Sequence, residues 1–301
     1  RDTVAICGYH GWHDWYLATN LKNNSDLEEH LLPGLEPNGV PSGLKGSVLP
    51  FSFNKFDQLE EISRNNNLAA VIMEVQRSVP PKEGFLESIR KLCKEKGIVL
   101  IFDECTSGFR ETYGGLHKKY GVNPDMAMFG KALGNGYAIT SIIGKKEIME
   151  AAQNSFISST FWTERIGPSA ALETLKIMKE EKSWEKITNT GLILTKHWRE
   201  IASQHDLNID FFGLPALRGF SFKSKDNLKY KTLITQECLK KGFLAANSCY
   251  VSTAHEPKII EHYLDILNEI FALISKCERK EVLIDNLLEG PTCHSGFKRL
   301  N

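Results

Sequence analysis

The feature that most constrains this chain is an alternation of short apolar runs with segments of helical periodicity. The runs at residues 68–74 and 98–102 are too apolar to leave one face in water, which is typical of strands buried on both faces. Between them, residues 84–96 place apolar side chains at helical spacing, and Gly97 is positioned to end that helix. This order predicts an α/β fold with a mainly parallel sheet covered by helices.

The pattern continues to about residue 168 and then changes. Further strands are predicted at residues 4–7, 126–129 and 138–143. Long helical patterns follow at residues 170–178 and 184–205. Beyond them come two predicted strands and two predicted helices, at residues 208–212, 216–222, 230–241 and 257–276.

We therefore expect two domains, a large sheet domain over residues 1–205 and a smaller C-terminal α+β domain over residues 206–301. Residues 20–50 are rich in Gly, Pro and Asn, which favours a long loop of the kind that often carries function.

Charge and cysteine content exclude several classes of protein. The 37 Lys and Arg residues balance 37 Asp and Glu residues, which argues against a nucleic-acid partner. No stretch approaches the ~20 apolar residues that span a bilayer, so no membrane association is expected. The seven cysteines form no close C-x-x-C pair, which indicates reduced thiols and a cytoplasmic location. The start at Arg1, without Met or a secretory pattern, suggests a fragment of a longer protein.

Asp103 and Lys131 each follow a predicted strand, where open α/β sheets bind their ligands. A carboxylate at position 103 could keep a ring nitrogen protonated, or it could cap the following turn. Lys131 lies among glycines and alanine, where desolvation could free its amine to attack a carbonyl and form a Schiff base. An Asp and a Lys ending two strands of one sheet fit the pattern of pyridoxal phosphate enzymes.

Two other segments carry polar or aromatic side chains near predicted strand or helix ends. Tyr9 could stack on a planar cofactor with His10 beside it, or both could belong to an aromatic core. His10 and His13 have no further ligand set, so no metal is expected. Residues 158–168 supply hydroxyls at a helix start, which suits a phosphate contact or an ordinary cap.

Together these motifs resemble the class III, fold type I pyridoxal-phosphate aminotransferases, and most of all their glutamate-1-semialdehyde aminomutase-like branch. The resemblance rests on four segments that occur in order along the chain: Tyr9–Gly11, Ile101–Arg110, Phe129–Gly136 and Ser159–Pro168. It extends from about residue 4 to the C-terminus and implies pyridoxal 5'-phosphate as cofactor.

Site roles follow from this resemblance. It implies that Lys131 forms the Schiff base and then carries the proton between the substrate Cα and the cofactor C4′. It implies that Asp103 pairs with the pyridine nitrogen, that Tyr9 stacks on the ring with His10 adjacent, and that Thr163 binds the phosphate of a partner subunit's cofactor. Thr160 is the competitor for that last role. A homodimer with shared active sites is implied as well.

The sequence departs from the family pattern in three places. The usual Glu-Pro is Glu74-Val75 here, which leaves the roles of Glu74 and Gln76 open. The Gly-Ser/Thr phosphate loop of relatives would lie upstream of Arg1. Aminomutases carry an acidic residue in the segment matching residues 244–254, and this chain has none there. The last point favours an aminotransferase that moves an amino group between an amino donor and an oxo or aldehyde acceptor.

Two alternatives stay open, a glutamate-1-semialdehyde 2,1-aminomutase and a truncated relative without activity. The sequence does not identify the substrate. The side chains that could line its site, or equally belong to the core or an interface, are Trp12, Trp15, Trp162, Arg165, Arg218 and His255.

Overall fold

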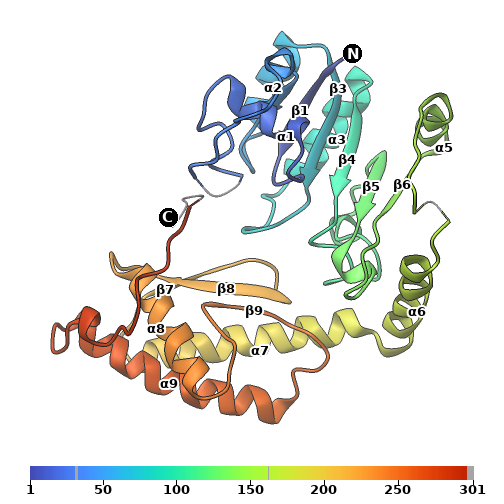
Figure 1. Ribbon diagram of the computed structural model, residues 1–301. Helices are drawn as coiled ribbons and strands as arrows, with labels where there is room; N and C mark the ends of the chain where they lie inside the picture. The colour runs from blue at the N-terminus through green and yellow to red at the C-terminus, as the bar shows by residue number, and fades with distance from the viewer. Residues whose placement is uncertain (31–32, 162, 297–301) are drawn as a thin grey trace. The chain divides into compact units, whose positions relative to one another are not determined.

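A computed structural model describes residues 1–30, 33–161 and 163–296 (Figure 1). They form two compact units, Arg1–Lys182 with the chain from Gly296, and Ser183–Ser295. The units divide at Lys182–Ser183, whereas we expected a division at 205–206. The physical reason is helix α7 (Ser183–Gln204), whose buried side chains Leu194 and Trp198 belong to the core of the second unit.

The first unit contains a six-stranded sheet in the order β2-β1-β3-β4-β5-β6. Its strands are β1 (Thr3–Cys7), β2 (Val48–Pro50), β3 (Leu68–Glu74), β4 (Val99–Asp103), β5 (Met126–Phe129) and β6 (Ser141–Gly144). Strands β1 to β5 pair in parallel, and β6 pairs antiparallel with β5. The predicted mainly parallel α/β sheet is confirmed.

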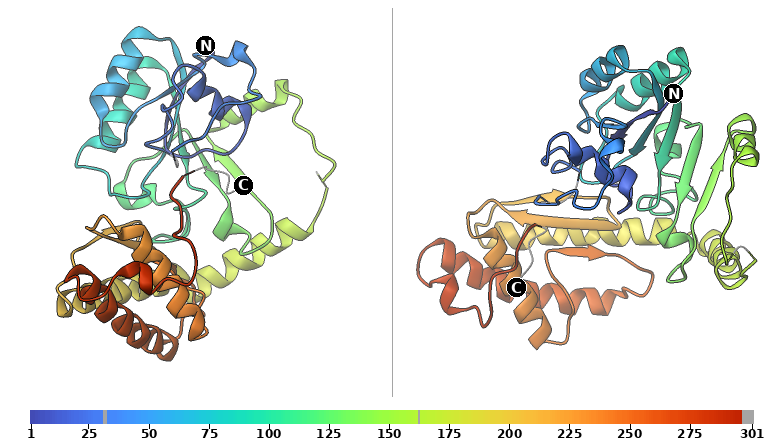
Figure 2. Two further views of the ribbon diagram at one scale, coloured as in Figure 1. Left: turned by 60° about the vertical axis from the view of Figure 1, so that its left-hand side comes forward. Right: turned by 45° about the horizontal axis from the view of Figure 1, so that its top comes forward.

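Helices cover both faces of this sheet. Helices α2 (Phe56–Asn65) and α3 (Phe85–Lys96) lie side by side on one face (Figures 1 and 2). On the other face, Tyr16 of α1 (Asp14–Leu17) packs in one cluster with Ile6 and Ile72. Burial on both faces explains why the strand sequences show no polar alternation.

Helix α3 ends as its sequence predicts. Gly97 has the left-handed φ of +59°, and its N–H bonds back to the carbonyls of Cys93 and Lys94. Two short helices, α4 (His117–Tyr120) and α5 (Lys146–Met149), and the longer α6 (Ile166–Glu181) complete the first unit. The predicted helix at residues 170–178 is the central part of α6.

Two expectations for the first unit need correction. The segment at residues 20–50 is more structured than a loop, because it contains two 3-10 helices, Ala18–Leu21 and Ser42–Leu44, and ends in β2. The predicted strand at 138–143 is shifted to Ser141–Gly144.

The second unit is a three-stranded antiparallel sheet packed against long helices. Its strands are β7 (Ile209–Phe212), β8 (Leu217–Phe222) and β9 (Ser248–Tyr250), with helices α8 (Asn227–Lys240) and α9 (Pro257–Glu278) beside α7. An aromatic cluster joins the layers, because Phe220 of β8 lies 5.0 Å from Trp198 of α7 and 5.7 Å from Phe271 of α9.

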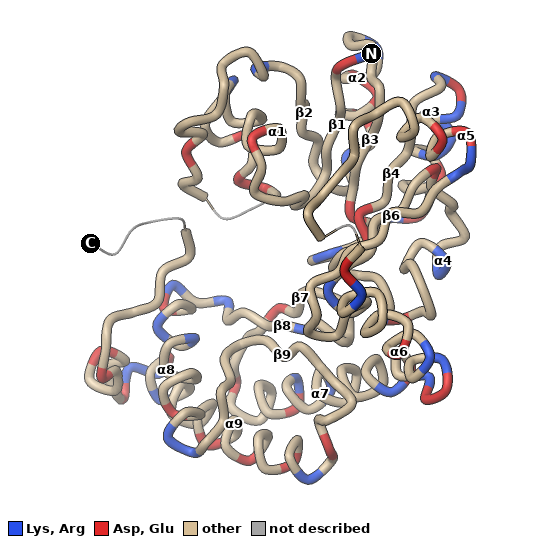
Figure 3. The backbone as a smooth tube through the Cα atoms, turned by 45° about the vertical axis from the view of Figure 1, so that its right-hand side comes forward, with Lys and Arg blue, Asp and Glu red and all other residues tan. Residues whose placement is uncertain are grey.

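Charged residues of both signs are interspersed along both units (Figure 3). Within the described ranges, none of the helices combines the length and the apolar character needed to cross a bilayer. All seven cysteines are free thiols.

Candidate active site at the carboxyl edge of the sheet

Asp103 is the last residue of β4, and its carboxylate is held by two donors. The His10 imidazole lies with Nδ1 2.9 Å from Oδ2, and the Cys105 backbone N–H donates to Oδ1 at 3.0 Å. Because an ionised carboxylate only accepts hydrogen bonds, Nδ1 is the protonated nitrogen of this pair. His10 follows β1, so strands β1 and β4 together fix the carboxylate.

The surroundings keep Asp103 ionised although its side chain is only 9% exposed. Burial by itself would raise the pKa of Asp103, but hydrogen bonding and charge from His10 outweigh it. The Cys105 N–H acts in the same direction, and the net pKa of Asp103 lies below its ordinary value. A carboxylate with about four lone-pair directions and two of them used can still accept from a ligand.

The second ring nitrogen of His10, Nε2, is buried, and it has no hydrogen-bond partner within the described residues. His10 itself is 8% exposed, and its ring meets the edge of Tyr16 at 5.9 Å. The imidazole is therefore fixed by packing on one side and by Asp103 on the other.

Lys131 begins the 3-10 helix Lys131–Leu133 directly after β5. Its φ of +45° lies in the left-handed region, which costs a non-glycine residue energy. The side chain is exposed, and Nζ donates to the Thr106 hydroxyl at 3.1 Å. An added Cβ on Gly130 would lie 3.3 Å from Cys105 Sγ, so this glycine lets the two loops approach closely.

The turn after β4 brings Asp103 and Lys131 to one place. Thr106 of this turn bonds Lys131, while the preceding Cys105 bonds Asp103. The charges of both residues act on the Cys105 thiol. Burial and Asp103 raise the pKa of Cys105 to about 11, and Lys131 opposes this rise. Strands β4 and β5 are parallel neighbours, which is why their ends meet.

An open surface depression of about 590 Å³ lies beside Lys131 and is otherwise lined by residues 136–140. Gly134 closes the turn before this segment, because an added Cβ there would lie 2.1 Å from the Tyr137 carbonyl oxygen. The lysine amine is thus accessible to a ligand of small-molecule size.

Tyr9 lies next to this edge of the sheet and is half-buried. Its backbone N–H donates to Glu74 Oε2 at 3.1 Å, and its ring contacts Trp12 at 5.3 Å in an edge arrangement. Glu74 ends β3 and pairs in register with Asp103 of β4. Gln76 is buried and accepts a 2.6 Å hydrogen bond from the Tyr120 hydroxyl.

Sequence reasoning did not identify Thr106 and Glu104 as site residues. Glu104 is completely buried and accepts from the Ser107 hydroxyl, the backbone N–H groups of residues 116 and 117, and the His117 ring. These bonds fix the turn that carries Thr106. The sequence signal for Glu104 is its place beside Asp103 at the end of an apolar run, where both carboxylates are expected near the end of the strand.

The structure does not join the predicted phosphate-binding residues to this site. Thr163 and its competitor Thr160 are exposed, and no hydrogen bond among the described residues links either to Lys131 or Asp103. Trp162 lies outside the described residues. Trp12 is 55% exposed, and Trp15 stacks on His13 at 5.5 Å.

Arg218 and His255 both belong to the second unit. Arg218 donates to the Gly213 carbonyl at 2.7 Å. His255 accepts from the Ser252 backbone N–H at 2.9 Å through Nδ1.

The aminotransferase class-III family model matches residues 8–273. A 3-aminobutyryl-CoA aminotransferase from Cloacimonas acidaminovorans is 33% identical over 248 residues, which cover 78% of this chain and 55% of that protein. A glutamate-1-semialdehyde 2,1-aminomutase from Methanocaldococcus jannaschii is 28% identical over 286 residues, with coverages of 87% and 66%. The chain thus spans between about half and two thirds of the length of these relatives.

Solved structures show the same fold. The FumI protein of Sphingopyxis sp. MTA144, in its PLP internal aldimine form, superposes with a TM-score of 0.81 at 22% identity. The match covers 96% of this chain and 68% of that one. An omega-transaminase from Sphaerobacter thermophilus gives a TM-score of 0.77 at 22% identity and covers 92% and 69%. Motif order, sheet topology and the family match agree, and this chain belongs to the class-III aminotransferases.

Proposed function

We propose that this chain carries the catalytic part of a pyridoxal-phosphate-dependent aminotransferase, which moves an amino group between an amino donor and an oxo or aldehyde acceptor. The observation that supports it most strongly is the meeting of Asp103 and Lys131 at the ends of neighbouring parallel strands. One is a carboxylate kept ionised, and the other is an accessible amine.

The residues present fit pyridoxal 5'-phosphate. Asp103 has unused acceptor capacity and a lowered pKa, so it can bind a protonated ring nitrogen as an ion pair. Lys131 is exposed and is held at Nζ only by Thr106 among the described residues, which suits a covalent attachment to the cofactor aldehyde. When bound, the cofactor supplies an electron sink for negative charge at the substrate Cα.

The chain's own residues divide the remaining work. Lys131 Nζ would be the general acid and base of the reaction, taking up and giving back the proton that leaves the substrate Cα. The Thr106 hydroxyl holds that amine in place through its 3.1 Å bond. His10 positions Asp103. Tyr9 would supply an aromatic ring to stack on the cofactor.

A homodimer with shared active sites is part of this proposal. A group of large apolar side chains is exposed on the first unit between residues 137 and 172, where a soluble monomer rarely leaves so many uncovered. Its most exposed members are Phe156, Phe161, Leu172 and Ile166, at 98%, 76%, 71% and 66%. Thr163 lies in this segment, and the proposal is that its hydroxyl binds the cofactor phosphate of a second copy seated there.

A cytoplasmic location also remains a proposal. It is supported by seven free thiols, of which Cys7, Cys93 and Cys238 are buried.

The proposed function is tested by loading the protein with pyridoxal 5'-phosphate and adding glutamate or alanine without an acceptor. We expect the visible absorption band of the bound cofactor to disappear as the amino group is transferred, and to return when an oxo acid is added. A protein that binds no cofactor, or whose band ignores every amino donor, contradicts the proposal and favours the inactive relative.

The alternative of a glutamate-1-semialdehyde 2,1-aminomutase is favoured by the similarity to enzymes of that name. Against it stands the absence of an acidic residue at positions 244–254. Glutamate semialdehyde supplied alone separates the two functions. Formation of 5-aminolevulinate without a second amino acceptor would assign the aminomutase reaction.

A further inference from the structure

The short segment after β1 carries two side chains of the candidate active site, and it lies outside any helix or strand. Tyr9 is proposed to stack on the cofactor, and His10 holds Asp103 at 2.9 Å. Buried backbone donors in such a segment cannot rely on the hydrogen-bond ladder of a strand or helix and need other partners. The places of Tyr9 and His10 therefore depend on what binds the backbone of residues 8–10.

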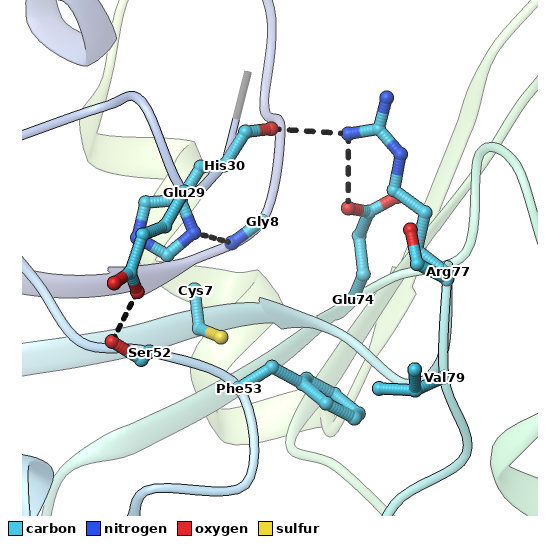
Figure 4. A pocket seen from close by; sticks show the side chains of 10 residues that line it. Cys7, Gly8, Glu29, His30, Ser52, Phe53, Glu74, Arg77 and Val79 are labelled. Carbon is cyan, nitrogen blue, oxygen red and sulfur yellow. Dashed lines mark hydrogen bonds and ion pairs between the residues drawn. The ribbon is translucent and has the colours of Figure 1, made fainter. Parts of the chain in front are cut away.

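Side chains from three segments of the chain hold this backbone. The Gly8 N–H donates to His30 Nδ1 at 3.1 Å (Figure 4), and the Tyr16 hydroxyl donates to the Gly8 carbonyl at 2.9 Å. The Tyr9 N–H donates to Glu74 Oε2 at 3.1 Å. Position 8 requires glycine, because its φ is +120° and an added Cβ would lie 2.6 Å from Glu74 Oε2.

The contact of His30 with Gly8 requires a neutral imidazole. Nδ1 accepts the hydrogen bond, so the proton of the neutral ring lies on Nε2. His30 is buried, and burial lowers its pKa to about 4. Glu29 opposes this shift of the pKa, whereas His10 and Arg77 act in the same direction as burial. The ring is therefore an acceptor near pH 7.

Arg77 links His30 to Glu74, so the two acceptors of the segment are joined to each other. Its Nη1 donates to the His30 carbonyl at 3.2 Å and lies 3.6 Å from Glu74 Oε2 (Figure 4). A cavity of about 260 Å³ adjoins these three residues, and Cys7 and Glu29 are the other titratable groups that line it. Burial raises the pKa of Cys7, so its thiol is neutral. The cavity is large enough for water, which can bring protons to His30.

We propose that His30 is a positioning residue of the candidate active site, whose neutral ring fixes Gly8 and thereby the two residues that follow it. Through them it sets the place of the Tyr9 ring and the pairing of His10 with Asp103. A protonated ring carries N–H at both nitrogens, so Nδ1 would face the Gly8 N–H as donor against donor and the bond would be lost. The inference rests on the proposed function for what the site does, although these contacts require no cofactor.

The first test follows amide hydrogen exchange of the cofactor-free chain by mass spectrometry of peptides that contain Gly8. His30→Leu removes the acceptor, and exchange at Gly8 should become about 10-fold faster, the usual effect of leaving a buried donor without its partner. His30→Asn should keep most of the protection, because its carboxamide oxygen can accept in place of Nδ1. The control is His197→Leu on α7, a half-exposed histidine paired with Glu200, which should leave exchange at Gly8 unchanged.

The second test observes the pairing of His10 with Asp103, which a merely structural role of His30 would not change. In the isotope-labelled, cofactor-free protein, the His10 Nδ1–H bound to a carboxylate should give a downfield proton signal, which His10→Asn identifies by its loss. His30→Leu should shift or broaden this signal, and His30→Asn should restore it. In the wild type the signal should weaken as the pH falls from 6.5 toward 4, before the far-UV circular dichroism changes, because protonation of His30 releases Gly8.

Wild-type exchange at Gly8 in His30→Leu, an unchanged His10 signal, or equal damage by the Asn and Leu substitutions would each overturn the inference. If His30→Leu does not fold, the His10 signal of the wild type across the acid range still decides it. A chain that shows these effects of His30 but fails the amino-donor test would refute the proposed function and leave His30 as the residue that positions His10. Turnover of amino donors with a His10 signal indifferent to His30 would do the reverse.

Discussion

The two units of this chain differ in what they bury. Among the described residues, every buried carboxylate and imidazole belongs to the first unit: His10, His30, Glu74, Asp103, Glu104, His117 and Asp125. The buried polar side chains of the second unit are Thr195 and Ser275, within a core dominated by Trp, Phe, Tyr, Leu and Ile.

This difference suggests that the first unit provides the chemistry of the protein, whereas the core of the second unit serves mainly stability. Burying a charged or polar group costs free energy unless partners satisfy it, and several of these groups gather at the carboxyl edge of one sheet. The second unit follows the simpler rule that apolar burial stabilises. Truncating apolar side chains in the second unit should therefore lower stability at every pH, whereas substitutions in the first unit should change the chemistry or the pH dependence of stability. Four substitutions test that contrast.

The largest effect on chemistry is expected for Lys131→Ala. Removing the amine removes both the covalent attachment and the proton carrier, and general acid-base catalysis alone contributes roughly 10²–10⁴-fold. The amino-donor half-reaction should fall by at least that factor, as measured by single-turnover absorbance. The urea-unfolding midpoint should equal that of the wild type within experimental error, because the Lys131 side chain is exposed. Lys91→Ala, on the exposed face of α3, is the matched control.

The largest effect on stability is expected for Trp198→Ala in the second unit. Trp198 is fully buried against Phe220, and truncating such a side chain costs about 3–5 kcal/mol of unfolding free energy. Trp12→Ala, at a side chain that is 55% exposed, should cost far less. A Trp198→Ala protein as stable as the wild type would contradict the assignment of the second unit's core.

A pH-dependent effect is expected from His30. Its folded pKa of about 4 lies below the ordinary value of 6.5, so the unfolded chain binds the proton more readily between these values. The contribution of the neutral His30 ring to the unfolding free energy should be fully present above pH 6.5. The unfolding free energy should then fall by on the order of 2–3 kcal/mol as the pH falls toward 4. His30→Asn keeps an acceptor for the Gly8 N–H and should flatten this part of the pH profile in urea denaturation. Equal pH profiles for both proteins would contradict a buried neutral imidazole.

The smallest effect is expected for His10→Ala. Losing one hydrogen bond to a charged group costs about 1–3 kcal/mol, and the pKa of Asp103 should rise toward its ordinary value. In the wild type, the lowered pKa of Asp103 stabilises the fold at pH values above the ordinary pKa of an aspartate. This stabilisation is lost as the pH falls through the pKa of Asp103 in the folded protein. His10→Asn, whose amide can replace the Nδ1–H donor, should restore much of the loss. An Ala variant with the wild-type acid-unfolding curve would show that His10 does not hold Asp103.

Sequence periodicity predicted most of this fold because parallel strands buried on both faces have an unmistakable composition. The strand 68–74 and the helix ending at Gly97 are at their predicted places. Strand β2 was missed because three residues in a Gly- and Pro-rich stretch give no periodic signal. The compact units divide before α7 and the expected domain boundary lies after it, because the sequence of α7 does not tell which sheet its apolar face covers.

The sequence predicts the site residues that end strands, but it does not predict the contacts that the turns make. Asp103 and Lys131 follow apolar runs, so their approach follows from parallel strands in one sheet. The Thr106–Lys131 bond and the proximity of Arg77 to Tyr9 depend on turns whose paths no periodicity describes. Thr163 remains a prediction, since its proposed ligand belongs to a second copy.

The most direct test of the central claim is to locate the cofactor-bearing lysine. The protein loaded with pyridoxal 5'-phosphate is reduced with borohydride and digested, and the modified peptide is sequenced by mass spectrometry. We expect the reduced cofactor on Lys131, with Asp103→Asn lowering cofactor occupancy at the same lysine. Modification of a different lysine, or labelling of Lys131 that is indifferent to Asp103, would contradict the claim that these two residues hold one ring.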